Sequence, residues 1–233
     1  EAGIFIGTTV GEQTYFYPNS SITRAEVATI VWRIYQANAT NTKQKIHYGD
    51  YTLDVLEGVP TNNYDKSAFY KDGSIMRYND PSVRTRLGID VSQYQGDIDW
   101  TAVAGSGVEF AIARVGGRGY TAGAVFADPK FDEYADGAAS AGLQVGAYFF
   151  SQAISVAEAE EEAYFVLDKL RGHSITGPVV FDWEVIGKSS ARTYGLETSV
   201  LCAAARTFCE IIESAGYDAM IYINDYAGYI KYD

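Results

Sequence analysis

The chain has 233 residues, of which 47% are hydrophobic and 21% charged, a composition typical of a globular protein with one sizeable core. Its formal net charge of −12 argues against nucleic acid as a partner, because neutralising phosphates requires clustered lysine and arginine. No window of the sequence approaches the run of about 18 apolar residues that spans a membrane, so no membrane span is predicted.

Residues 1–40 contain one predicted helix. In Thr23-Arg24-Ala25-Glu26 the threonine hydroxyl can cap a backbone N–H while the glutamate reaches back to the cap. With residues 16–22 ahead of it, this segment resembles the second half of an S-layer homology repeat, a module that anchors proteins to wall polysaccharide. The resemblance implies that Arg24 contacts a secondary cell-wall polysaccharide. A helix that merely packs on its neighbour is the alternative.

Residues 41–84 are polar and rich in turn signals, among them Asn79-Asp80-Pro81. Segments 67–70 and 75–78 flank one of these turns and can form a small hairpin. We expect a linker or a ribbon here and assign it no chemistry.

Residues 85–233 alternate predicted strands with predicted helices, the pattern of a parallel sheet covered by helices. Asp128 and Pro129 are predicted to begin one helix that ends at Gly142, and a capping box at Ser155 begins a second. A third helix is expected over residues 197–215. Strands are expected near residues 87–91, 109–115, 143–150, 178–183 and 218–223. These elements predict an α/β fold.

Two segments of this region suggest a site but have simpler explanations. The acidic run from Glu158 to Glu162 falls in the first turns of a helix, where negative charge favours the helix dipole, and we expect it to be solvated. Residues 116–119, Gly-Gly-Arg-Gly, lack both the dinucleotide-binding spacing and the Gly-Lys-Ser/Thr ending of a phosphate loop. We expect a tight loop there.

Two carboxylates end the apolar run Val179-Val180-Phe181-Asp182-Trp183-Glu184. Side chains alternate along a strand, so Asp182 and Glu184 point to the same side. Two acids on one face repel each other, which raises at least one pKa, and glycoside hydrolysis requires one protonated and one ionised carboxyl group. A strand end whose acids face solvent is an equal alternative for this segment alone.

A third acid, Asp90, ends the first expected strand and precedes the polar loop 93–96. The carboxyl ends of parallel barrel strands form one rim, where barrel enzymes build their sites. We therefore expect Asp90 to meet the pair at 182 and 184.

The residues around these acids resemble glycoside hydrolase family 25, the lysozymes that cut bacterial cell-wall glycan. The resemblance begins at residues 88–100, GIDVSQYQGDIDW, and continues in order through 110–116 (FAIARVG), 142–152 (GLQVGAYFFSQ) and 180–184 (VFDWE). It implies an irregular, flattened TIM-like β/α barrel over residues 85–233. The closing strands of that barrel do not precede Asp233, so we expect a C-terminally incomplete barrel in a chain that begins inside one module and stops inside another.

The resemblance implies hydrolysis of the β-1,4 bond between N-acetylmuramic acid and N-acetylglucosamine in peptidoglycan glycan strands, by a secreted or wall-associated enzyme without a cofactor. Glu184 is then the general acid, its proton held by burial and neighbouring acids. Asp182 either attacks the anomeric carbon or holds the substrate's acetamide, which attacks instead. We favour the second route, because both acids lie on one side of the sugar. Asp90 tunes the pair and binds substrate.

Four further residues at the expected rim are candidates for substrate binding. Tyr148 ends the third strand, and Tyr222 and Asn224 share one face of the fifth, where they can bond to or stack on sugars. Tyrosines inside barrels are common, so a structural role is equally open for them. Arg114 ends the second strand, and a structural ion pair explains it better than substrate contact.

Cysteine and histidine predict no further site. Cys202 and Cys209 lie two helical turns, about 10 Å, apart, which is too far for a disulfide, so we expect two free buried thiols. His47 and His173 are the only histidines and belong to no ligand-spaced cluster, so no metal is predicted.

Two alternatives to a muramidase stay open. The same acid pair and acetamide chemistry would serve a glycosidase acting on another N-acetylated glycan such as chitin. A wall-binding protein that keeps the groove without turnover is consistent with the S-layer-like segment and the missing closing strands.

Overall fold

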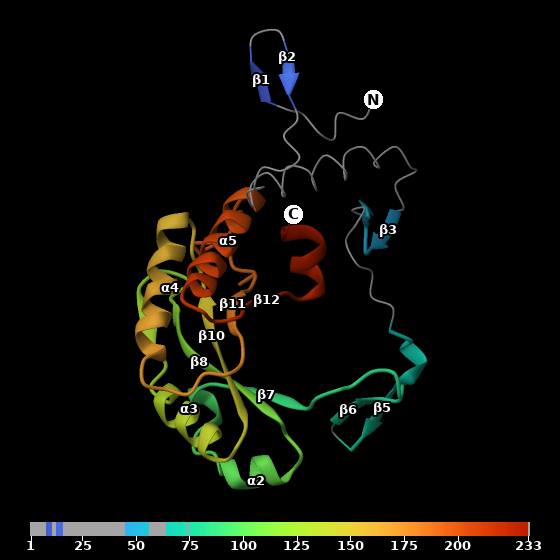
Figure 1. Cartoon of the computed structure of the whole chain (residues 1–233), viewed down its shortest axis with the longest axis vertical. Coiled ribbons are helices and arrows are strands. Elements are labelled where there is room, and N and C mark those ends of the chain that lie inside the picture. Colours follow the sequence, from blue (N-terminus) through green and yellow to red (C-terminus); the bar gives the residue numbers. More distant parts are fainter. Residues whose placement is uncertain (1–7, 11–12, 16–44, 56–63, 74, 233) are drawn as a thin grey trace. The chain divides into compact units, whose positions relative to one another are not determined.

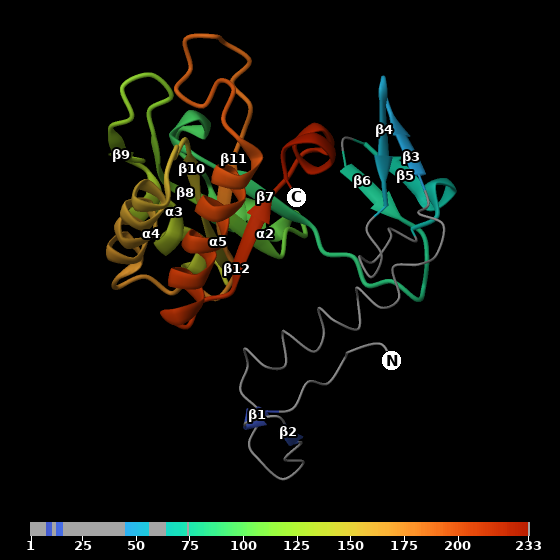
Figure 2. The same cartoon turned by 90° about the horizontal axis from the view of Figure 1, so that it is seen from above.

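The computed structural model describes residues 8–10, 13–15, 45–55, 64–73 and 75–232 (Figures 1 and 2). Two compact units divide the chain, Glu1–Lys66 and Ser67–Asp233, and each is treated by itself. The helix expected after Thr23, with Arg24 on it, lies outside the described residues.

The first unit contains two antiparallel strand pairs, β1 (Thr8–Val10) with β2 (Gln13–Tyr15) and β3 (Lys45–Tyr48) with β4 (Tyr51–Asp54). Gly49 at the β3–β4 turn has a φ of 55°, a conformation that glycine adopts without strain. Neither pair was anticipated from the sequence.

A 3-10 turn, η1 (Lys66–Ala68), spans the boundary in sequence between the units, and the second unit continues with a hairpin of β5 (Phe69–Asp72) and β6 (Ile75–Tyr78). This is the hairpin expected from the turn signal between these segments. An ion pair between Arg77 Nε and Asp72 Oδ2, 2.7 Å long, joins the two strands.

The main sheet has five parallel strands in the order β7-β8-β10-β11-β12, and β9 pairs antiparallel with β8. The strands are β7 (Gly88–Val91), β8 (Phe110–Arg118), β9 (Val125–Ala127), β10 (Gln144–Ser151), β11 (Val179–Trp183) and β12 (Ala219–Tyr222). All five expected strands are present with ends shifted by a few residues, which confirms the α/β fold. Within residues 75–232 the sheet is open, with β7 and β12 as its edges, so the expected barrel is not seen as a closed ring.

Helices α3, α4 and α5 pack against the sheet (Figure 1). The helical elements are η2 (Gln93–Gln95), α2 (Trp100–Gly105), α3 (Phe131–Ser140), α4 (Val156–Leu170), α5 (Thr198–Ser214) and the C-terminal turn η3 (Ala227–Lys231). Alternate strand residues, such as Val145, Ala147 and Phe149 of β10, are fully buried in the core beneath these helices. The other set of alternate residues is left for the opposite face of the sheet.

Two local expectations were wrong because tertiary partners override local signals. Lys130 and not Asp128 is the N-cap of α3, which begins at Phe131. Asp128 Oδ1 accepts from the Lys130 N–H at 2.9 Å just ahead of the helix, and its Oδ2 accepts from Arg114 Nε at 2.7 Å. Gly116 and Gly117 lie in β8 rather than in a loop, and a Cβ on Gly116 would stand 2.1 Å from the Phe126 carbonyl oxygen of β9.

The start of α4 departs from expectation at one residue. Ser155 caps the helix as predicted, accepting from the Glu158 N–H at 3.3 Å, while the Glu158 carboxylate accepts from the Ile154 N–H. Glu162 was expected in solvent but is fully buried, because its side chain faces β8 and pairs with Arg118 of that strand.

Candidate active site

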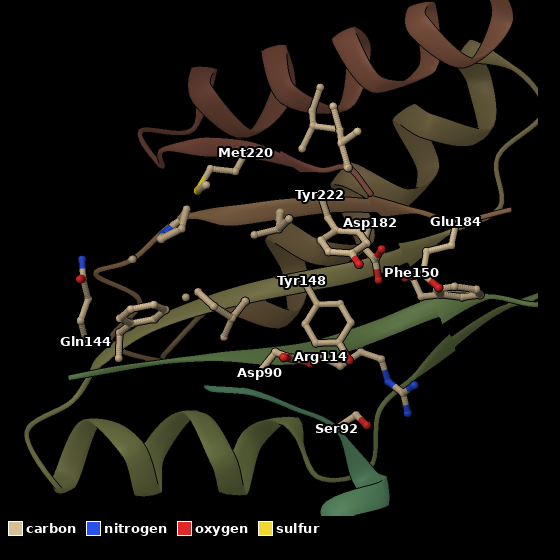
Figure 3. A pocket seen from close by; sticks show the side chains of 18 of the residues that line it. Asp90, Ser92, Arg114, Gln144, Tyr148, Phe150, Asp182, Glu184, Met220 and Tyr222 are labelled. Carbon is tan, nitrogen blue, oxygen red and sulfur yellow. The ribbon is translucent and has the colours of Figure 1, made fainter. Parts of the chain in front are cut away.

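A cavity of about 940 Å³ follows the face of the sheet opposite to the core. It extends from Arg86, Gln144 and Pro178 near the amino ends of the strands to the acids at their carboxyl ends. The residues that line it come from all five parallel strands and include Asp90, Ser92, Tyr94, Phe110, Ile112, Arg114, Tyr148, Phe150, Val180, Asp182, Glu184, Met220 and Tyr222 (Figure 3).

Strand alternation places the two acids of β11 in this cavity. Val180, Asp182 and Glu184 line it, while Phe181 and Trp183 between them are buried in the core. Asp90 reaches the same cavity from β7 and is close enough to repel the Asp182 carboxylate. In the view of Figure 3 the Tyr148 ring lies between Asp90 and the pair of acids on β11. None of the three carboxylates forms an ion pair with any described residue.

The three acids differ in their surroundings. Asp182 is only 9% exposed, and its Oδ1 has no hydrogen-bond partner among the described residues. Burial, followed by repulsion from Glu184 and Asp90, raises the pKa of Asp182 to about 7, against a smaller lowering by Arg114. Sequence reasoning assigned the retained proton to Glu184, whereas the structure raises the pKa of its neighbour, Asp182.

Two tyrosines of the cavity stand over the acids. Tyr148 of β10 lines the cavity together with Ser92, and burial raises its pKa to about 12, so its hydroxyl stays protonated and can donate a hydrogen bond. Tyr222 of β12 is 46% exposed, and burial together with repulsion from Glu184 and Asp182 raises its pKa as well. Figure 3 shows both rings directed toward the acid end of the cavity.

Arg114 lines the cavity but is engaged with Asp128 in a nearly buried ion pair. The same Asp128 oxygen accepts from the Gln93 N–H at 3.0 Å, and the Arg114 guanidinium lies 5.0 Å from the centre of the Tyr94 ring. The pair therefore ties β8 to the loop after Asp90. Sequence reasoning missed Asp128, because an Asp-Pro pair before a helix is an ordinary capping signal.

Asn224 does not reach the cavity. Strand β12 ends at Tyr222, and the Asn224 Oδ1 accepts from the Ala227 N–H at 2.8 Å, which caps the C-terminal helical turn. We therefore remove Asn224 from the candidate substrate-binding residues.

Other site types find no support in residues that the structure describes. These residues contain no group of three or more potential metal ligands and no helix that could cross a bilayer. Neither Cys202 nor Cys209 forms a disulfide with a described residue, and each is only partly buried.

Comparison with known proteins gives matches over this same region. The chain is 28% identical over 135 residues to the autolytic lysozyme of Clostridium acetobutylicum, covering 58% of this chain, and 32% identical over 114 residues to lysozyme M1 of Streptomyces globisporus, covering 48%. It spans only 37% of the length of each of these relatives.

Structural comparison identifies the fold of the chain. A family 25 glycosyl hydrolase from Bacillus anthracis superposes with a TM-score of 0.53 at 22% identity, covering 69% of this chain and 70% of that one. The profile of glycosyl hydrolases family 25 matches residues 89–227, which is more than half of the chain and includes all three acids of the cavity. The chain belongs to glycosyl hydrolases family 25.

Proposed function

We propose that this chain is a peptidoglycan muramidase, which hydrolyses the β-1,4 bond between N-acetylmuramic acid and N-acetylglucosamine. The observation that carries the proposal is the convergence of Asp90, Asp182 and Glu184 on one cavity, where none of them forms an ion pair with a residue that the structure describes. The two curated relatives are lysozymes by name, which supports the same substrate class.

We propose that one proton passes from Asp182 to Glu184 when substrate binds. Before substrate binds, Asp182 retains the proton, because burial and two neighbouring acids oppose its ionisation. A substrate acetamide N–H bonded to the unpartnered Oδ1 of Asp182 favours the ionised form of that carboxyl group. The proton then belongs to Glu184, the general acid.

The reaction follows from these positions. Asp182 accepts a hydrogen bond from the acetamide N–H. Glu184 donates its proton to the glycosidic oxygen as the acetamide oxygen attacks the anomeric carbon and the C–O bond breaks. Water then opens the cyclised intermediate and returns a proton to Glu184. Direct attack by Asp182 is the alternative, and only that route forms a covalent glycosyl-enzyme that a 2-fluoro sugar can trap.

The remaining cavity residues have supporting roles in this proposal. Asp90 adds negative charge beside the pair and binds a substrate hydroxyl. Tyr148 donates a hydrogen bond from its neutral hydroxyl, and the exposed ring of Tyr222 stacks on a sugar face. Arg114, paired with Asp128, holds the loop after Asp90 rather than the substrate.

We also propose that the open sheet is part of the irregular barrel of family 25, and that residues 1–40 attach the protein to a secondary wall polysaccharide through Arg24. Sequential strand order with helices outside supports the barrel. The attachment rests on the sequence resemblance alone. Both assignments are consistent with a secreted or wall-associated enzyme.

Purified wall sacculi test the function. The parent protein, Glu184→Gln and Glu210→Gln are incubated with sacculi, and the new reducing ends are identified; Glu210 is an exposed residue of α5 away from the cavity. Muramic acid ends from the parent and Glu210→Gln, but not from Glu184→Gln, support the muramidase. Cleavage of chitin oligomers alone would identify the other glycosidase, and binding without cleavage would identify a wall-binding protein.

A further inference from the structure

The side-chain amide of Gln152 lies behind Glu184, outside the cavity. Gln152 follows the last residue of β10 and is fully buried. Its Nε2 donates to the Glu184 carbonyl oxygen at 3.2 Å and to the Ser151 carbonyl oxygen at 2.9 Å. Its Oε1 accepts from the Thr193 hydroxyl at 2.8 Å. Both amide hydrogens and the amide oxygen are therefore used.

Glu184 needs such a contact because the sheet does not hold it. The pairing of β11 ends at Trp183 on the β10 side and at Asp182 on the β12 side. Glu184 is the first residue beyond both ladders and the start of the loop that leads to α5. The buried Thr193 belongs to the same loop, so one amide fastens the loop at two points.

We propose that Gln152 is a positioning residue that fixes the backbone of Glu184 and thereby the separation between the Glu184 and Asp182 carboxyl groups. Its catalytic consequence rests on the muramidase activity proposed above. Its structural consequence, a defined spacing of the two acids, does not depend on that activity.

The three hydrogen bonds at position 152 require an amide side chain. Only a carboxamide donates two hydrogen bonds and accepts one from a single planar group. A glutamate would direct an ionised carboxylate at two carbonyl oxygens, and a methionine of similar length would leave the Glu184 carbonyl and the Thr193 hydroxyl without this partner. Gln152→Met therefore removes the contact with little change in packing volume.

Greater mobility of the Glu184 backbone changes the pKa of Asp182. The charged and titratable groups that interact with Asp182 are Asp90, Arg114, Tyr148, Glu184 and Tyr222 on or beside the strands and Tyr232 after the C-terminal turn. Of these groups, Glu184 is the one whose backbone carbonyl oxygen accepts a hydrogen bond from the Gln152 side chain. Greater average separation weakens the repulsion between the two carboxylates, so the Asp182 pKa falls.

The experiment measures that pKa by carboxyl ¹³C NMR titration of the full chain, with the Asp182 signal assigned through Asp182→Asn. We expect Gln152→Met to titrate Asp182 at lower pH than the parent does, and kcat on sacculi to fall about 10- to 100-fold with KM retained. Ile212→Val, a buried change on α5, is the matched control and leaves both quantities at parent values.

The outcomes separate the two proposals. A parent without muramidase activity would overturn the proposed function, while the titration would still decide the role of Gln152. If Gln152→Met does not fold, Thr193→Val removes only the bond to Oε1 and should shift the titration in the same direction by less. A folded variant with the parent's Asp182 pKa and kcat would overturn the positioning role.

Discussion

The guanidinium of Arg118 on β8 and the carboxylate of Glu162 on α4 form an ion pair with an Nε–Oε1 distance of 2.7 Å, and both side chains are buried. The second Glu162 oxygen accepts from the Ser151 hydroxyl at 2.6 Å. Arg118 also donates to the Gly123 and Glu158 carbonyl oxygens. This cluster joins the carboxyl ends of β8 and β10, the strands that carry Arg114 and Tyr148, to the first turns of α4.

Arg118→Met should destabilise the protein strongly, because it leaves Glu162 buried without its counter-charge. Removing one partner of a buried pair costs about 3–5 kcal/mol, whereas removing one of an exposed pair costs about 0–1 kcal/mol. Urea unfolding measures the difference, with Arg77→Met, which breaks the exposed pair to Asp72, as the control. Equal losses for the two variants would contradict a dominant role for the buried pair.

Asp182→Asn should change how stability depends on pH. The Asp182 pKa is raised from 3.8 to about 7, so the folded state holds this proton more tightly than the unfolded chain does. The stability that the proton contributes is complete below pH 3.8 and is lost as the pH rises through about 7. Asparagine does not ionise, so the free energy of unfolding of the variant should rise relative to that of the parent as the pH increases between these limits, by up to about 4 kcal/mol.

Unfolding in urea at a series of pH values between 4 and 8 tests this gain. Asp97→Asn is the control: its bond to Lys130 lowers the Asp97 pKa below 3.8, so Asp97 stays ionised throughout this range and the difference from the parent should be nearly constant. A constant difference between Asp182→Asn and the parent at every pH would contradict the raised pKa.

The two cavity tyrosines should respond differently to substitution. Tyr222 is proposed to act through its ring, so Tyr222→Phe should retain KM on wall fragments while Tyr222→Ala raises it; loss of one aromatic stacking contact corresponds to roughly 1 kcal/mol, or about fivefold. Tyr148 is proposed to act through its hydroxyl, so Tyr148→Phe should lower kcat about tenfold or more. Steady-state kinetics on soluble muropeptides separates the two effects, and an unchanged kcat in folded Tyr148→Phe would remove the hydroxyl from the mechanism.

The sequence was sufficient to predict on which side of its strand each acid lies, because side-chain direction is a local property of a strand. Apolar runs ending in Asp90 and in Asp182-Trp183-Glu184 specify both the strand and the side on which each acid stands. The common cavity then follows from parallel pairing in sequential order. The alternation of strands and helices predicts that the strands are parallel, but doubly wound folds share this alternation, so it does not predict the sequential order of the strands.

The buried charges were not predicted, because their partners are distant in sequence. Glu162 is separated from Arg118 by 44 residues, and an acidic run at a helix start normally faces solvent. A signal was nevertheless present. Glu162 lies three residues after Ala159 and four before Val166, so it belongs to the buried face of α4. Glu160 and Glu161 lie on the exposed face. Helical period, rather than composition, identifies the one buried acid of the run.

Two glycine-to-alanine changes should have opposite effects on stability. Gly137 lies inside α3, and a Cβ there would stand 2.3 Å from Cδ1 of the buried Trp100. Alanine favours a helix over glycine by about 1 kcal/mol, but displacing a packed indole costs typically 1–3 kcal/mol, so Gly137→Ala should be destabilising. Gly105 at the end of α2 has nothing within 4 Å of the same added atom, so Gly105→Ala should be stabilising. Thermal unfolding of the two variants measures both signs, and a stabilising Gly137→Ala would show that Trp100 moves aside without loss of packing.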